Sequence, residues 1–214
     1  MNSQLRQLWL DNKRFFWAAG LLLLGGAVIG FVQADLVESL AKQMMGQIKE
    51  IVQRIKHNGG GVVSTFWAIF SNNVMSSLMM MALGLFFAFF PIIGLLSNGV
   101  LLGFILAKIS AAGINPLLVF AVGILPHGMF ELPAVVFAAG VGIRLGLLSF
   151  RSVGVLLRVN QLEQVKSEWH SLLKQFPAAV LSVIALLFIA ALVESVITPL
   201  LLQSTVGGPF QMFE

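Results

Sequence analysis

Long apolar stretches, separated by short polar segments, dominate the pattern along the chain. Five stretches are almost wholly apolar, and they cover residues 15–34, 62–90, 98–109, 117–150 and 177–202. A helix needs about 20 apolar residues to cross the ~30 Å hydrocarbon core of a bilayer. The pattern therefore predicts an all-α, polytopic membrane helical bundle of about five spans, built as a single integral membrane domain over residues 1–214.

The fourth stretch is interrupted by ionisable residues and prolines. His127 and Glu131 lie four residues apart between Pro126 and Pro133, inside an otherwise apolar run. Ionisable groups at membrane depth are costly and by default indicate function, and each proline removes a backbone donor. We therefore expect a broken helix that packs inside the bundle. Whether it forms one broken span or two elements stays open at this stage.

Two segments have the periodicity of amphipathic helices. In the first, within residues 35–61, apolar residues recur at steps of three and four from Val37 to Ile55, and Asn58 with three glycines ends the pattern. In the second, within residues 151–175, apolar residues share a face with a basic polar side. We expect the first to lie on the outer membrane surface or on the bundle, or to dock an extracellular partner through Lys42 and Lys49. The second reads as a helix on the cytoplasmic surface.

The charges give one consistent topology. Residues 1–14 are net basic, which places the N-terminus in the cytoplasm. Segment 35–61 is then outside, a turn at 91–98 inside, loop 110–116 outside and the basic region 151–175 inside. The C-terminus follows on the outer side.

Composition supports the membrane assignment and narrows the chemistry. The chain is 58% hydrophobic and 10% charged, against roughly 25% charged residues in soluble domains. There is no cysteine, which excludes disulfides and thiolate chemistry. A zinc protease needs His-Glu-x-x-His, and no second histidine lies near His127. We therefore expect no enzyme activity, no metal, no cofactor and no nucleic-acid partner.

Small residues and amides favour close contacts between helices. Gly-x-x-x-Gly spacings allow backbones to approach one another, and they also leave a homodimer open. The residues concerned are Gly26, Gly30, Gly99, Gly103, Gly142 and Gly146. Asn72 and Asn73 either cap the start of the second span or form contacts between helices.

The histidine and the glutamate allow more than one interpretation. His127 and Glu131 either bond each other and the neighbouring backbone to fix the break, or relay protons or ions as in transporters. A conformational or assembly role is the third interpretation. No internal repeat supports a transporter fold.

Ordered landmarks in residues 71–148 resemble the stage II sporulation protein M family. They are Asn72 and Asn73, then Asn98 and Gly99 with Gly103, then His127, Gly128 and Glu131 before a glycine-rich span. The resemblance implies a multi-pass protein of the cell membrane, in the mother-cell or septal membrane for the sporulation member, with the lipid bilayer as its surroundings. It implies no catalytic residue.

The resemblance also implies a function. The sporulation member takes part in forespore engulfment as a scaffold for two cell-wall hydrolases, stage II sporulation proteins D and P, which remodel peptidoglycan. From the resemblance we expect a non-enzymatic scaffold. The alternative is a small transporter or channel-like subunit that uses the broken helix with His127 and Glu131.

Overall fold

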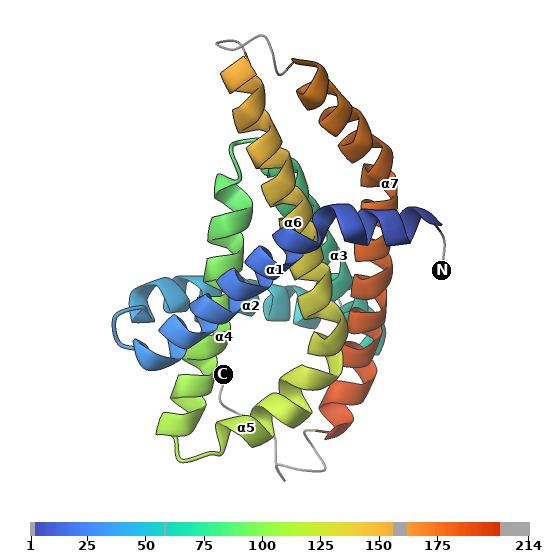
Figure 1. Ribbon diagram of the computed structural model, residues 1–214. Helices are drawn as coiled ribbons and strands as arrows, with labels where there is room; N and C mark the ends of the chain where they lie inside the picture. Colours follow the sequence, from blue (N-terminus) through green and yellow to red (C-terminus); the bar gives the residue numbers. More distant parts are fainter. Residues whose placement is uncertain (1–2, 58, 156–161, 202–214) are drawn as a thin grey trace.

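The computed structural model describes residues 3–57, 59–155 and 162–201, and this part of the chain is helical without a strand (Figure 1). The elements are α1 (Ser3–Val32), α2 (Glu38–His57), α3 (Gly61–Leu83), α4 (Phe89–Ala111), α5 (Pro116–Val119), η1 (Phe120–Ile124), α6 (Leu125–Val155), α7 (Leu162–Leu192) and η3 (Val193–Ile197). The predicted all-α class is confirmed. The C-terminal tail, for which we predict the outer side, lies outside the described residues.

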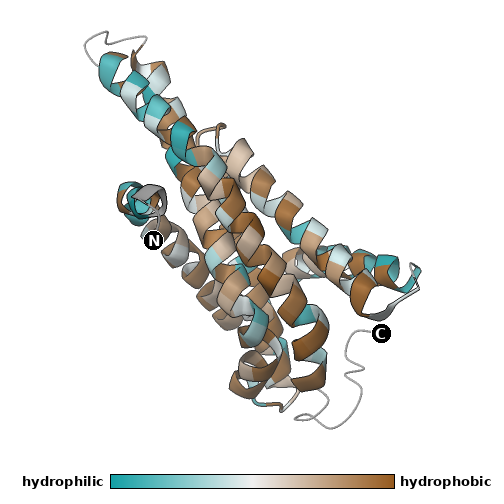
Figure 2. Ribbon diagram, turned by 90° about the vertical axis from the view of Figure 1, so that its right-hand side faces the viewer, coloured by the Kyte–Doolittle hydropathy of each residue, from teal (hydrophilic) through white to brown (hydrophobic). Residues whose placement is uncertain are grey.

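Within the described residues, five helical segments are long and apolar enough to cross a membrane. They are Arg6–Val32, Gly61–Leu83, Phe89–Ala111, Pro116–Val155 and Leu162–Leu201. Figure 2 shows apolar residues over most of the bundle and polar residues gathered toward its extremities. The α3–α4 turn and the far end of α6 lie at one end of the molecule, and the α4–α5 loop lies at the opposite end (Figure 1). This arrangement fits a multi-pass membrane protein.

Helix α6 is the centre of the bundle. Every residue from 138 to 143 is buried, and α6 contacts α1, α3, α4 and α7. The chain stays helical from Pro116 to Val155 and includes a π-helical segment, η1, while Pro126 to Pro133, where the sequence predicts a break, lies within α6. Pro133 is accommodated inside α6. The prediction that this segment packs inside the bundle holds for residues 134–148, most of which are buried, whereas Leu117, Leu125 and Met129 are exposed.

The turn between the second and third spans differs from the prediction. The sequence predicts a turn at 91–98, but the chain reverses at residues 84–88 and α4 begins at Phe89. Pro91 lies in the first turn of α4, where a missing backbone donor costs nothing, so it starts a helix rather than ending one. Asn98 and Gly99 consequently lie within α4 and do not begin a span.

Helices α1 and α4 pack along the glycines. A Cβ on Gly26 would lie 2.6 Å from the carbonyl oxygen of Leu96, and a Cβ on Gly99 or Gly103 would clash with the backbone of α1. Gly30 lies equally close to Val100. The two backbones are therefore in direct contact, which is the geometry that small residues permit in membranes.

Helix α6 meets the α3–α4 turn through two further glycines. Gly142 lies against Met80 and Gly84, and Gly146 lies against the backbone of Ala88. Ala88 has a left-handed backbone, with φ of 64°, and is buried. The unusual turn is thus held in place by the helix that packs on it.

The second amphipathic segment is not a separate surface helix. Residues up to Val155 belong to α6, and residues from Leu162 begin α7, which continues through Pro177 into the last span. The apolar side of the amphipathic part, with Val165 and Leu172, is buried in the same cluster as Ala179 and Val183 further along. One apolar stripe therefore packs on the bundle along the length of α7, so the surface helix and the span form a single element.

Candidate functional site

Three ionisable side chains meet between α6 and the end of α7. His127 and Glu131 lie one turn apart on α6, and Glu194 comes from η3. One potential ligand atom from each side chain lies within 4.8 Å of the other two, and all three residues are half-buried. We call these three residues the α6–η3 cluster.

The local backbone positions the cluster. A π-helical segment precedes His127 in the chain, and a second one contains Glu194. Such segments are rare, and they are frequent at functional sites. Nδ1 of His127 lies 3.3 Å from Oγ1 of Thr198, which is buried just beyond η3. The ring of His127 is therefore oriented by the same helix end that carries Glu194.

The negative charges of the two carboxylates in the cluster are not offset by a cation within the described residues. Within the described residues, neither Glu131 nor Glu194 has a hydrogen-bond donor or a cationic partner. Two carboxylates this close together in apolar surroundings repel each other. The arrangement can either share protons or hold a cation between the oxygens, and the His/Glu/Glu set is chemically suited to a metal ion.

Sequence reasoning found two members of the cluster and missed the third. Glu194 lies 63 residues beyond Glu131, toward the far end of the last span. The sequence signal for Glu194 is its position within a predicted span, because an acidic residue there is itself a functional indicator. Gly128, the remaining residue of the motif, is buried on α6, where the atoms nearest to an added Cβ would be side-chain atoms of Ile124 of η1 and Leu132 of α6.

The two asparagines lie on the outer surface of α3. Asn72 and Asn73 are within the uninterrupted helix and do not cap it. The Nδ2 atom of Asn72 lies 3.3 Å from Oδ1 of Asn73, and this contact is exposed. The amides therefore face outward from the bundle, at the middle of a helix that is apolar enough to span a membrane.

A hollow of about 400 Å³ lies beside these amides, between α2 and α3. We call it the α2–α3 groove, and its lining residues are Arg54, Gly60, Val63, Ser64, Trp67, Ala68 and Ser71. Trp67 is 58% exposed, and Asn72 follows Ala68 by one helical turn. The groove thus combines an exposed aromatic ring with the hydroxyl groups of Ser64 and Ser71, and the amide of Asn72 lies one turn beyond Ala68 along α3.

Helix α2 is fastened to the bundle near both ends. Glu38 pairs with Lys42 at 2.8 Å and with Lys108 of α4 at 3.5 Å. The hydrogen bond from Lys42 and the charge of Lys108 lower the pKa of Glu38. Near the other end, Oγ of Ser64 donates to the carbonyl of Ile55. Lys42 and Lys49 are both exposed, as a partner-binding role requires.

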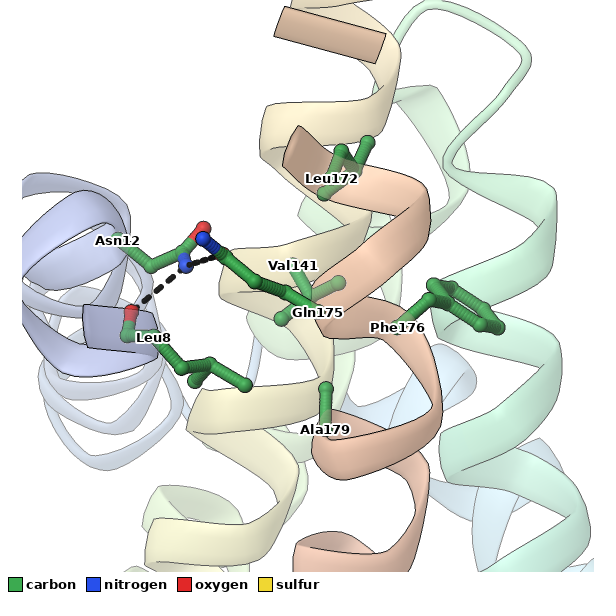
Figure 3. A pocket seen from close by; sticks show the side chains of 7 residues that line it. All are labelled: Leu8, Asn12, Val141, Leu172, Gln175, Phe176 and Ala179. Carbon is green, nitrogen blue, oxygen red and sulfur yellow. Dashed lines mark hydrogen bonds between the residues drawn. The ribbon is translucent and has the colours of Figure 1, made fainter. Parts of the chain in front are cut away.

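A separate polar network joins α1, α6 and α7. Nη1 of Arg144 donates to Oδ1 of Asn12 and to Oε1 of Gln175, each at 3.0 Å. Asn12 is 1% exposed, and its Nδ2 donates to the carbonyl of Leu8 at 2.7 Å. Figure 3 shows the side chains of Asn12 and Gln175 meeting between the helices. This network fills the space between the three helices and is structural.

The chain is similar to a known protein family. The model of the stage II sporulation protein M family matches residues 18–199. An uncharacterized protein of Methanocaldococcus jannaschii is 27% identical over 174 residues, which are 81% of this chain and 88% of that protein. No solved structure matches the chain. The family match includes all of α2 to α6, the α6–η3 cluster and most of the described bundle, and the chain therefore belongs to the stage II sporulation protein M family.

Proposed function

We propose that the protein is a non-enzymatic membrane scaffold that anchors and localises peptidoglycan-degrading hydrolases during forespore engulfment. The partners in this proposal are stage II sporulation proteins D and P, and the site of action is the septal membrane of the mother cell. Family membership supports a sporulation membrane protein. The observation that carries the scaffold role is the α2–α3 groove with the outward amides beside it.

The side chains of Asn72 and Asn73 need hydrogen-bond partners on the outer face of α3. Hydrocarbon chains offer no hydrogen bonds, and an unsatisfied polar group in lipid costs several kcal/mol by order of magnitude. The pair of Asn72 and Asn73 satisfies part of its own hydrogen-bonding capacity. A second helix against α3 would supply the rest, and Trp67 would add apolar contact area. A hydrolase with a membrane anchor is a partner of this kind.

The test is co-purification of tagged hydrolases D and P with variants of this protein. Asn72→Leu with Asn73→Leu should lower recovery of the hydrolases at least tenfold, and Trp67→Ala should lower it further. Charge reversal at Lys49 tests the polar face of α2 separately, whereas charge reversal at Lys42 also removes the ion pair with Glu38. Ser182→Leu, on the half-buried surface of α7, is a matched control for added hydrophobicity. Unchanged recovery with all of the α3 variants would exclude the groove as the docking site.

A transporter or channel-like subunit is the second candidate function. The observation in its favour is the α6–η3 cluster, because ionisable groups inside a bundle are typical of ion pathways. Purified protein in liposomes would then show ion flux that Glu131→Gln abolishes. Absence of flux together with recovery of the hydrolases would support the scaffold instead.

A further inference from the structure

We propose that His127, Glu131 and Glu194 bind one divalent first-row transition-metal ion. The site would join α6 to the end of α7. This inference does not depend on the scaffold role, since it rests only on the geometry and donor chemistry of the α6–η3 cluster. It differs from the expectation of no metal site that we drew from the sequence, in which His127 and Glu131 supplied only two ligands.

The donor atoms select the class of metal. One imidazole nitrogen and two carboxylate oxygens suit Zn²⁺, Mn²⁺ or Fe²⁺. Mg²⁺ prefers oxygen ligands and retains several waters, and Cu⁺ prefers sulfur ligands. The chain has no cysteine to provide a thiolate. Three protein ligands leave at least one coordination position for water or for a further ligand.

The distances are close to those of a metal site. The ligand atoms lie within 4.8 Å of one another. In a tetrahedral site with ligands at about 2.1 Å, they would lie about 3.4 Å apart. A closure of at most about 1.4 Å is needed, which changes in side-chain torsion supply without moving either helix.

The two carboxylates of the cluster need a cation or protons to offset their negative charge. Two carboxylates face each other, and no Lys or Arg of the described residues pairs with either of them. A divalent cation would balance both carboxylates at once. Protons shared among the three side chains are the competing arrangement, and the test below distinguishes the two.

Thr198 orients the histidine ring of the proposed site. A metal-bound histidine usually has its second ring nitrogen held by a hydrogen bond, which fixes the tautomer. Nδ1 of His127 lies 3.3 Å from Oγ1 of Thr198. In the proposed site Nδ1 donates to Thr198, and Nε2 binds the ion. Thr198 is thus a positioning residue rather than a ligand.

The experiment uses the full-length protein in detergent, purified through a tag without histidine. Equilibrium dialysis against Zn²⁺, Mn²⁺ and Co²⁺ should give about one ion per chain. His127→Ala and Glu194→Gln should each weaken binding at least tenfold. Exposed residues of the same types provide the matched controls His170→Ala and Glu163→Gln, which should bind like the parent protein.

Two readouts separate direct ligation from a folding effect. Bound Co²⁺ should show visible absorption bands of a four- or five-coordinate site, and these should disappear in the His127 and Glu194 variants. The ion should also raise the Tm of the parent protein but not that of the variants. Stoichiometric binding that survives both substitutions, or no binding by the folded parent protein, would overturn the proposal and leave a proton-sharing cluster.

Discussion

At the scale of single residues, the surroundings of Glu131 determine how the α6–η3 cluster assembles. It shares the α6–η3 cluster with a second carboxylate and an imidazole. Each of the three side chains depends on the other two, because none of them has a charged partner elsewhere in the described chain. Substitutions at this residue therefore report on assembly of the site as well as on its chemistry.

We predict that Glu131→Ala lowers protein abundance and assembly more than Glu131→Gln. Glutamine keeps the shape and the hydrogen-bonding atoms of glutamate, whereas alanine removes the side chain and leaves a space between α6 and η3 that destabilises the packing. Quantitative blotting of membranes and recovery of the complex measure the difference. A Glu131→Gln protein that is abundant, fully assembled and inactive in engulfment would favour a proton-relay role.

Arg144 shows how a single cation can organise three helices. It bonds to Asn12 of α1 and to Gln175 of α7. We predict that Arg144→Met lowers the free energy of unfolding by about 1–3 kcal/mol, because the buried oxygen of Asn12 loses its charged donor. Thermal unfolding in detergent measures the change. Lys174→Met, on the exposed side of α7, serves as the control and should have little effect.

At the scale of elements, the α1–α4 contact depends on glycine. We predict that Gly99→Ala lowers the Tm, because the new methyl group would collide with the carbonyl of Leu23 and the two helices would have to separate. Gly25→Ala is the matched control, since a Cβ at Gly25 meets nothing within 4 Å and alanine favours helix. Equal Tm values for the two variants would contradict the importance of this contact.

The attachment of α2 to α4 should depend on pH. The pKa of Glu38 is lowered in the folded protein by the hydrogen bond from Lys42 and the charges of Lys108 and Lys42. The ion pairs therefore hold at pH values above the ordinary pKa of glutamate and are lost as the pH falls through the lowered value. We predict that spin labels at Gln43 and Ala111 move apart as the pH falls well below the ordinary pKa of glutamate. Glu38→Gln should give the wider distance distribution at every pH.

At the scale of the whole molecule, the topology remains a prediction from charge. The α3–α4 turn and the α4–α5 loop lie at opposite ends of the bundle, as alternating crossings require. We predict that Gln47→Cys reacts with a membrane-impermeant thiol reagent in intact cells that lack an outer membrane. The parent chain has no cysteine, so the background is low. Labelling only after lysis would place α2 in the cytoplasm.

Hydrophobic patterning predicted much of this architecture. The segment 35–57 corresponds to α2, and the apolar runs correspond to the five long helices. The turn at 84–88 was not predictable in this way, because Leu85, Phe86 and Phe87 are apolar residues without a turn signal. The continuity of α7 was also missed, since Pro177 is usually a sign of a helix end.

The candidate site was predicted only in part. His127 and Glu131 share one helix, so their spacing places them on one face. Glu194 joins them through tertiary packing of the last span, and nothing local in the sequence specifies that contact. The same holds for the network of Asn12, Arg144 and Gln175, because Arg144 looks like an ordinary charge near the end of a span.

The lengths of α6 and α7 have a mechanical consequence. Arg151 and Glu168 clamp the two helices near one end of the molecule, and Glu194 lies at the other end of α7. The 26 residues between Glu168 and Glu194 make a lever of about 39 Å. A tilt of only about 2° about that fulcrum would move the Glu194 end by about 1.4 Å. A small tilt of α7 would therefore change the distances between Glu194 and the two members of the cluster on α6.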